Sequence, residues 1–405
     1  MKIRSVTCFY NPKSRHPDLD LQQVGALSKE AVQRFQTRGF EVQTTRLATT
    51  PFPLFLDPAQ PAEAIQIASD LESDAKQHGF NYLSLGPAQP DSLQSYSLVP
   101  QILAATKNIF FGGIMATARE GVSIPAIKAC ARIIHQTATI KPNGFANLNF
   151  AALANVKPFG PFFPAAYQKG SQPGFSLAIE CADLALVNFS RAINLETARA
   201  SLLKTLQDYG RVLAGIAEEL AHKYNAVFHG IDYSLAPFPQ AWCSLGSALE
   251  RLGPQKLGLS GSLAAAAFIA DTLDRGTWPR AGFNGLILPV LEDSTLAERT
   301  SQGILTIKDL LLYSAVCGTG LDTVPLPGDA TEEQLTALLL DVAVLSIRLG
   351  KPLTARLMPI PGKSAGDPTD FHFDYFANGN VISLPASPLI GLLAEDQTFT
   401  LYPRH

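Results

Sequence analysis

The chain has 405 residues, of which 46% are hydrophobic and 17% are charged, and its 32 basic and 35 acidic residues give a formal net charge of -3. This composition is typical of an ordinary globular protein and excludes a largely disordered chain. Because the charge is near neutral and no Lys/Arg run is interleaved with aromatic residues, we expect no nucleic-acid partner. A small-molecule or protein partner is the better expectation.

The N-terminal stretch MKIRSVTCFYNPKSRHPDLD lacks the apolar core of a signal peptide, and no apolar run is long enough to span a bilayer. We therefore expect a cytoplasmic protein without a membrane partner. The cysteines are scattered, odd in number and without a C-x-x-C pair, which favours reduced thiols over a disulfide framework or a cysteine-rich zinc site. They are Cys8, Cys130, Cys181, Cys243 and Cys317.

Residues 1–140 alternate between strand-like and helix-like patterns. Alternating or continuous apolar runs predict strands, and apolar residues at helical spacing that end at glycine predict helices. Repeated β-α units of this length imply a largely parallel sheet covered by helices. The expected strands are 2–10, 41–48, 81–86 and 108–116, and the expected helices are 21–40, 61–80, 98–107 and 124–138.

A segment rich in Pro, Gly, Asn and Phe follows at 141–174 and shows no clear period. Long irregular segments in compact proteins are either linkers or loops with a function. The many Phe residues argue against a solvated linker, so we expect an ordered loop packed over the body, with a lid as one alternative. The chain is thus expected to form one large domain over 1–405.

Residues 175–405 return to β-α units. We expect a strand region at 174–189, helices at 195–224, 244–253 and 262–276, and strands at 226–237 and 283–293. The stretch 331–350 predicts a strong helix, with Thr331 as its N-cap and Gly350 just past its end. The stretch 370–386 has a β-like pattern.

Polar residues gather beside turn residues at four predicted strand ends of this second part: 229–239, 289–293, 317–329 and 356–367. In parallel α/β architectures, ligands bind at the loops that follow the carboxyl ends of the strands. These loops therefore predict the place of a pocket, though not its reaction. Neither PIPGKSAGD nor FGGIMA has the spacing of a familiar nucleotide-binding loop.

Acidic and basic residues in these loops are the candidates for chemistry. Asp232 and Asp322 are candidate catalytic bases, and Arg356 and Lys363 are candidate holders of an anionic group. Carboxylates could also bind Mg2+ or Ca2+, and the candidate ligands are Glu292, Asp293, Asp329 and Asp367. Structural roles are the alternative, because acids commonly cap helices and glycine turns. The cofactor stays unknown.

Cys317 lies in VCGTGLDTVPLPGD between glycines, which is compatible with two interpretations. Gly318 and Gly320 permit a tight backbone and leave room for a substrate to approach the sulfur of a catalytic thiol. A buried inert thiol is the alternative, since free cysteine is among the most buried residue types. His229 and Ser234 of HGIDYSLAPFP are candidate substrate contacts, although His229 fits a hydrogen-bonded strand residue as well.

Five pieces of the chain together resemble an uncharacterised family, domain-of-unknown-function family 711. They are IRSVT, FANLNFAALANVKPFGPFFPAAY, GIDYSLAP, CGTGLDTVPLPGD and PIPGKSAGD, and they cover almost the whole chain in order. The resemblance implies a ten-stranded α/β barrel like that of the glycyl radical enzymes and ribonucleotide reductases, with an inner loop. In that fold a cysteine at the loop tip is the thiyl site, which would correspond to Cys317. The RVxGY-like glycine loop and the adjacent cysteine pair are absent here, so no glycyl radical is expected.

The sequence leaves two functions open. The leading hypothesis is an enzyme that acts, without radical chemistry, on a small polar or anionic metabolite. The alternative is a non-catalytic small-molecule-binding or regulatory protein that keeps the pocket without turnover. A homodimer is the default oligomer, because two-fold symmetry is the commonest assembly.

Overall fold

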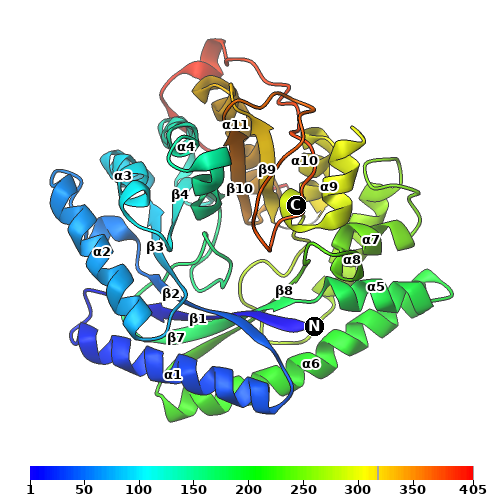
Figure 1. Ribbon diagram of the computed structural model, residues 1–405, viewed down its shortest axis with the longest axis horizontal. Coiled ribbons are helices and arrows are strands. Elements are labelled where there is room, and N and C mark those ends of the chain that lie inside the picture. Colours follow the sequence, from blue (N-terminus) through cyan, green and yellow to red (C-terminus); the bar gives the residue numbers. More distant parts are fainter. Residues whose placement is uncertain (317–318, 405) are drawn as a thin grey trace.

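The protein is a mixed α/β structure in which a large curved sheet lies inside a layer of helices (Figure 1). A computed structural model describes residues 1–316 and 319–404. Over these residues the sheet contains 11 strands, most of them in the order β8-β7-β1-β2-β3-β4-β6-β10-β9. The fold is thus of the mixed α/β class that the sequence predicts.

The elements of the first part alternate as expected. They are β1 (Lys2–Tyr10), α1 (Pro17–Thr37), β2 (Val42–Thr49), α2 (Pro61–Gln77), β3 (Tyr82–Ala88), α3 (Leu98–Ala105), β4 (Ile109–Thr117), β5 (Gly121–Ser123), α4 (Ile124–Thr137) and β6 (Phe150–Ala154). Each helix buries one apolar stripe against the sheet; α1, for example, buries Leu21, Val24, Leu27, Ala31 and Phe35 at spacings of three and four.

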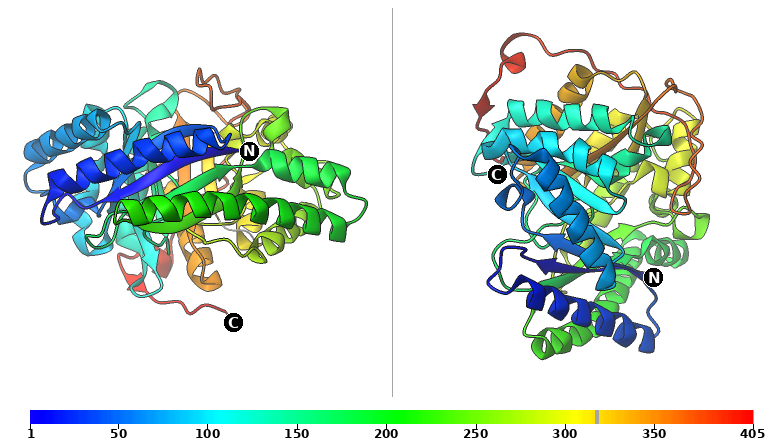
Figure 2. Two further views of the ribbon diagram at one scale, coloured as in Figure 1. Left: turned by 90° about the horizontal axis from the view of Figure 1, so that it is seen from below. Right: turned by 60° about the vertical axis from the view of Figure 1, so that its left-hand side comes forward.

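The second part adds further strands and most of the outer helices. They are β7 (Gly174–Glu180), α5 (Ala182–Arg191), α6 (Leu195–Lys223), β8 (Val227–Ala236), α7 (Leu245–Arg251), α8 (Ser262–Asp274), α9 (Ser294–Ser301), α10 (Ile307–Val316), β9 (Gly320–Pro327), α11 (Glu332–Leu349), β10 (Leu353–Ile360) and β11 (Thr398–Phe399). Helices α1 and α6 lie side by side on the outside although they are far apart in sequence (Figure 2, left).

The sheet is parallel in two blocks that run in opposite directions. Strands β1, β2, β3, β4 and β6 are mutually parallel, and so are the pairs β7-β8 and β10-β9. The joins between blocks, β1-β7 and β6-β10, are antiparallel. Parallel β-α units were predicted correctly, but these antiparallel joins were not. Because of them, the carboxyl ends of one block lie beside the amino ends of the other.

The segment between β8 and β9 is not the strand that 283–293 was expected to form. It makes single parallel bridges, Ile231 to Arg280 and Pro289 to Asp322, and then a short 3-10 turn at Val290–Glu292. The backbone N–H groups of Phe283 and Asn284 donate to the carboxylate of Asp232 instead of to a neighbouring strand. Side-chain capture of these donors explains why the apolar pattern was misleading.

The segment 141–174 is more regular than expected, because it contains β6. A 3-10 helix, Pro142–Asn149, precedes this strand, and the part after it, 155–173, packs against polar side chains of the sheet. The hydroxyls of Thr7, Ser84 and Ser176 donate to carbonyls of Pro161, Ala166 and Phe159 at 3.3, 2.8 and 2.6 Å. These strand hydroxyls are buried, so the loop satisfies groups that would otherwise lack partners.

Three further predictions from the sequence can be compared with the structure, and only one of them is confirmed. The pattern at 181–189 was assigned to a strand region, but α5 occupies it. The β-like tail at 370–386 makes one isolated bridge, Pro368 to Asn380, and packs through its aromatic residues. The N-cap at Thr331 is confirmed by a capping box with Gln334, and Gly350 ends α11 with a φ of 64°.

Within the described residues, no helix combines the length and hydropathy needed to cross a bilayer.

Candidate functional site

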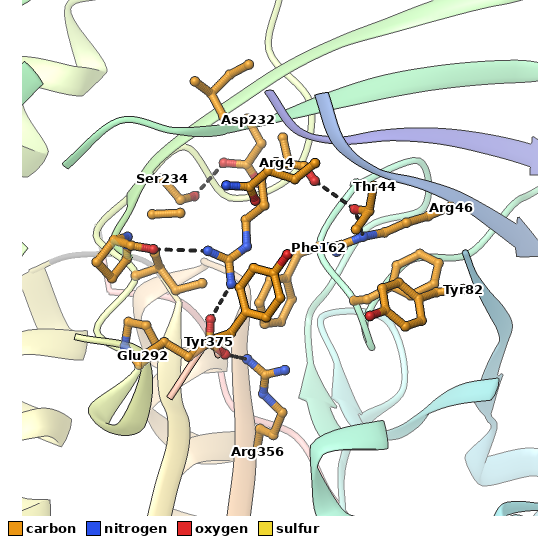
Figure 3. A pocket seen from close by; sticks show the side chains of 18 of the residues that line it. Arg4, Thr44, Arg46, Tyr82, Phe162, Asp232, Ser234, Glu292, Arg356 and Tyr375 are labelled. Atoms are coloured by element: carbon orange, nitrogen blue, oxygen red, sulfur yellow. Dashed lines mark hydrogen bonds and ion pairs between the residues drawn. The ribbon is translucent and has the colours of Figure 1, made fainter. Parts of the chain in front are cut away.

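A cavity of about 100 Å3 lies where the two blocks of the sheet face each other (Figure 3). On the same volume measure, one water molecule needs roughly 10–15 Å3, so the cavity has room for a small organic molecule. Its walls are largely aromatic, from Tyr82, Phe110, Phe162, Phe163, Phe283, Phe373 and Tyr375. Its charged lining consists of Arg4, Arg46, Arg356, Asp232 and Glu292.

Strand geometry places these charges together. Thr44 and Arg46 on β2 are two residues apart, as are Asp232 and Ser234 on β8, and residues at that spacing project from the same face of a strand. Arg4 comes from β1 and Arg356 from β10. Both blocks of the sheet therefore contribute, in keeping with their opposite directions.

Arg356 is the centre of a buried ion-pair network. Its Nε donates to Asp322 Oδ1 at 2.6 Å and a terminal nitrogen donates to Glu292 Oε1 at 2.8 Å, and all three side chains are nearly inaccessible. Burial opposes the charge on Arg356, but the two carboxylates outweigh it and raise its pKa. The guanidinium also lies over the ring of Phe162, 5.4 Å from the centroid.

Arg4 is matched in the same way. It forms an ion pair with Glu292, lies 3.8 Å from Glu180 and donates to the Pro237 carbonyl at 3.0 Å. Burial works against its charge, but Glu292 and Glu180 raise the pKa of Arg4 overall. Burial likewise works against the charge on Glu292, yet Arg4 and Arg356 together lower the pKa of this shared carboxylate.

Arg46 differs from both, because no carboxylate of the described chain forms an ion pair with it. Its Nε donates to Thr44 Oγ1 at 3.0 Å, and its guanidinium lies over the rings of Phe163 and Tyr82, at 5.3 and 5.9 Å from their centroids. Burial, together with the nearby charge of Arg4, lowers its pKa to about 9. Arg46 therefore stays cationic at neutral pH without an ion pair to a carboxylate of the described residues, and Glu292 favours its charge only from a distance.

Asp232 is a buried carboxylate on the opposite wall. It accepts hydrogen bonds from Ser234 Oγ and from the backbone N–H groups of Phe283 and Asn284, the latter two at 2.9 and 3.1 Å. Burial raises its pKa, and the hydrogen bonds only partly counter that effect. Asp232 is thus a carboxyl group with an altered proton affinity at the edge of a cavity, which is a property of general acids and bases.

The structure brings together four residues predicted from the sequence: Asp232, Ser234, Glu292 and Arg356 all line the cavity. Asp322 lies behind Arg356, fully buried, and its Oδ2 has no partner among the described residues. Burial raises the pKa of Asp322 despite the arginine.

Other predicted residues lie away from the cavity lining. The half-buried His229 stacks on Phe159 with ring centroids 3.9 Å apart, and burial lowers its pKa to about 4. Asp293 caps α9 and accepts from the backbone of Leu245 and Gly246. Asp329 is an exposed turn residue, and Asp367 accepts from the backbone of Ser364 in a turn.

The other residues predicted to bind substrate or to act as a thiol lie in different places. Lys363 lies 3.8 Å from Asp370. Gly320 has a φ of 96°, and a Cβ there would lie 2.1 Å from the Thr354 carbonyl oxygen, so packing requires a glycine. Cys317 and Gly318 fall outside the described residues. The other cysteines, Cys8, Cys130, Cys181 and Cys243, are free and buried.

The predicted metal ligands do not form one site. Glu292 pairs with arginines, whereas Asp293 serves as a helix cap. Across the described part of the chain, no group of three or more His, Cys, Asp or Glu side chains could hold a metal ion.

Sequence reasoning missed the residues that the first part of the chain contributes, above all Arg4, Thr44, Arg46 and Tyr82. A signal was present, since Arg4 and Arg46 place long cationic side chains within the strands KIRSVTCFY and VQTTRLAT. A long cationic side chain inside a buried strand is unusual and requires a partner.

Fold and site together define a mixed α/β protein with an arginine-rich, aromatic-walled internal pocket. The model of the family described as Uncharacterised ACR (DUF711) matches residues 1–378, and the chain belongs to this family. A UPF0210 protein of Pyrobaculum islandicum is 31% identical over 360 residues, covering 84% of this chain and 79% of its own. UPF0210 proteins of Pyrobaculum aerophilum and Methanosarcina acetivorans are 28% and 24% identical, covering 91% and 98% of this chain and 87% and 90% of their own.

Proposed function

We propose that the pocket binds a small organic anion and that Arg46 is the residue that recognises its charge. The observation that carries this proposal is the contrast among the lining arginines: Arg4 and Arg356 have carboxylate partners, whereas Arg46 has none within the described residues. A cation withdrawn from water without a counter-charge is unfavourable, and an anionic ligand would remove that penalty.

The hydrogen-bonding groups of the pocket support the same ligand class. The carboxylates of Glu292 and Asp232 already accept from Arg4, Arg356, Ser234 and backbone N–H groups. The terminal nitrogens of Arg46 donate to no acceptor within the described residues, and they are therefore free donors. A surplus of donors fits a ligand that supplies oxygen acceptors, such as a carboxylate.

Catalysis on this anion is a second candidate function, and Asp232 favours it. Its raised pKa and its place on the cavity wall suit proton transfer to or from a bound molecule. Ser234 and the backbone of Phe283 and Asn284 would hold its orientation. A ligand-binding protein without turnover would use the same pocket and leave Asp232 structural.

We also propose that the sheet closes into the ten-stranded barrel that the family resemblance implies. The bridges from Arg280 to β8 and from Pro289 to β9 support this, because the segment between them spans the two edges of the sheet. The loop 155–173, held by strand hydroxyls, would be the inner loop of such a barrel, in place of the stretch around Cys317 that the resemblance implied.

Thermal unfolding in the presence of small anions tests the binding proposal. Wild type, Arg46→Met and the control Arg211→Met would be titrated with acetate, succinate, benzoate and inorganic phosphate at constant ionic strength. Arg211 is an exposed surface residue paired with Asp208, so its removal leaves the pocket intact. Ligand at 100 times its Kd adds about 2.7 kcal/mol, or about 2 °C or more of Tm.

We expect at least one anion to raise the Tm of wild type and Arg211→Met but not of Arg46→Met. Equal responses of all three proteins to every anion would contradict recognition at Arg46. Turnover is addressed separately, by asking whether Asp232→Asn abolishes product formation from the anion while preserving its binding.

A further inference from the structure

The aromatic lining of the cavity and the orientation of the Arg46 side chain restrict the class of anion that suits the pocket. Resting on the proposed function, we propose that the pocket takes a planar aromatic monocarboxylate, with its carboxylate on Arg46 and its ring among the aromatic side chains. The cavity of about 100 Å3 holds the equivalent of several water molecules and so leaves room for a molecule of one ring.

Arg46 is held from one side only. Thr44 Oγ1 accepts from its Nε at 3.0 Å and itself donates to the Arg4 carbonyl at 2.7 Å, which fixes the side chain against β1 and β2. The rings of Tyr82 and Phe163 also contact the guanidinium, at 5.9 and 5.3 Å from their centroids. The edge carrying both terminal nitrogens is left for the cavity, and this edge matches the two oxygens of a carboxylate.

The lining arginines leave one positive charge without a carboxylate partner in the described chain, so a ligand with one negative charge is enough to match it. Arg356 is satisfied by Asp322 and Glu292, and Arg4 by Glu292 and Glu180. A monocarboxylate would complete the one arginine that lacks a carboxylate in the described chain. A phosphate dianion would bring a second charge close to Glu292 and Asp232, whose carboxylates also line the cavity.

The walls select the body of the ligand. The lining includes five aromatic side chains that are only half-buried, so each keeps accessible surface for a ligand: Tyr82, Phe162, Phe283, Phe373 and Tyr375. Figure 3 shows Tyr82, Phe162 and Tyr375 converging on the space between Arg4 and Arg46. Rings prefer offset or edge-to-face contacts with other rings, so these walls favour a flat unsaturated body over an aliphatic one.

A matched set of probes tests this class by calorimetric titration at constant pH and ionic strength. Benzoate is compared with cyclohexanecarboxylate, which has a saturated ring, acetate, which has no ring, benzamide, which has no charge, and phenyl phosphate, which has a different head. We expect benzoate to bind roughly tenfold more tightly than cyclohexanecarboxylate and acetate, with no binding of benzamide.

Variants separate the ring contacts from the charge. Arg46→Met is expected to abolish binding of benzoate and acetate alike. Tyr82→Leu is expected to weaken benzoate several-fold more than acetate, whereas Tyr82→Phe, which keeps the ring, leaves the benzoate Kd within about twofold. An effect of Tyr82→Leu that is equal for both ligands would mean that Tyr82 only supports Arg46.

The outcomes are distinguishable. Equal affinity for benzoate, cyclohexanecarboxylate and acetate, all lost in Arg46→Met, would overturn the aromatic class and leave the anion site in place. Tighter binding of phenyl phosphate than of benzoate would overturn the carboxylate head. Binding of no probe at all, or binding that survives Arg46→Met, would overturn both this inference and the function on which it rests.

Discussion

The two sides of the pocket treat charge differently. On the side formed by β8, β9 and β10, Arg356 is locked to Asp322 and Glu292 at hydrogen-bond distance and all three are nearly inaccessible. On the side formed by β2 and β3, Arg46 is half-buried and rests on aromatic rings and Thr44 without a carboxylate in the described chain. The first side pairs its buried charges with one another, whereas the second has a guanidinium without an ion pair among the described residues.

The largest effect should come from breaking the matched side. Arg356→Met leaves Asp322 and Glu292 as buried carboxylates short of a partner, which should cost about 3–5 kcal/mol of unfolding free energy. Urea denaturation measures this cost, with Arg211→Met as a control that should change stability by less than about 0.5 kcal/mol. Adding Asp322→Asn to Arg356→Met should recover part of the loss. A loss below about 1 kcal/mol in Arg356→Met would contradict the structural role of this network.

The start of β9 should be nearly as sensitive, for a reason of backbone geometry. Gly320→Ala places a Cβ 2.1 Å from the Thr354 carbonyl oxygen at a φ of 96°. Gly39→Ala is the matched control, because Gly39 has a φ of 84° but no atom within 4 Å of the new Cβ. We expect about 1 kcal/mol of destabilisation at Gly39 and at least about 2 kcal/mol more at Gly320. Equal losses of stability in the two variants would show that packing does not require a glycine at position 320. Gly320 would then again be a candidate for ligand binding.

His229 should give a smaller effect that depends on pH. Its pKa is lowered to about 4 in the folded protein, so between about pH 6.5 and 4 the unfolded chain binds more protons than the folded one. Stability from this group is complete above pH 6.5 and falls as the pH drops toward 4. From pH 7 to 5 we expect a loss of about 1–2 kcal/mol that is missing in His229→Phe. Parallel pH profiles of the two proteins would show that His229 titrates normally.

The smallest change in stability should come from Arg46. Arg46→Met removes a cation that forms no ion pair with a described carboxylate, although Glu292 lies near enough to feel its charge. The lost contacts with Tyr82 and Phe163 oppose the gain from no longer burying a charge. The free energy of unfolding should therefore stay within about 1 kcal/mol of wild type. A loss like that of Arg356→Met would mean that the two sides of the pocket do not differ as described.

The sequence predicted the β-α units of the first part closely, because hydrophobic period and glycine stops are local properties. It also identified Asp232, Ser234, Glu292 and Arg356 as neighbours, because they follow or occupy strands of one block. It could not place Arg4 and Arg46 beside them, because the antiparallel joins β1-β7 and β6-β10 are long-range pairings with no local signature. The rule that ligands bind at carboxyl ends of strands assumes one direction throughout the sheet, and this sheet has two.

The acidic residues Glu292 and Asp293 also show that residue type and spacing do not determine a side chain's role. Asp293 and Glu292 are adjacent in sequence and looked equivalent as metal ligands. In the structure one caps α9 and the other joins Arg4 to Arg356. Whether a carboxylate meets a helix N-terminus or an arginine depends on elements distant in sequence, so residue type and spacing alone did not separate these roles.

The central claim is that Arg46 is the anion-binding residue, and the most direct test is a crystal structure of the protein grown with benzoate. We predict density for a carboxylate within hydrogen-bond distance of both terminal nitrogens of Arg46, with the ring between Tyr82, Phe162 and Tyr375. An Arg46 that instead forms an ion pair with an Asp or Glu of the protein, in a cavity that holds no benzoate, would contradict it.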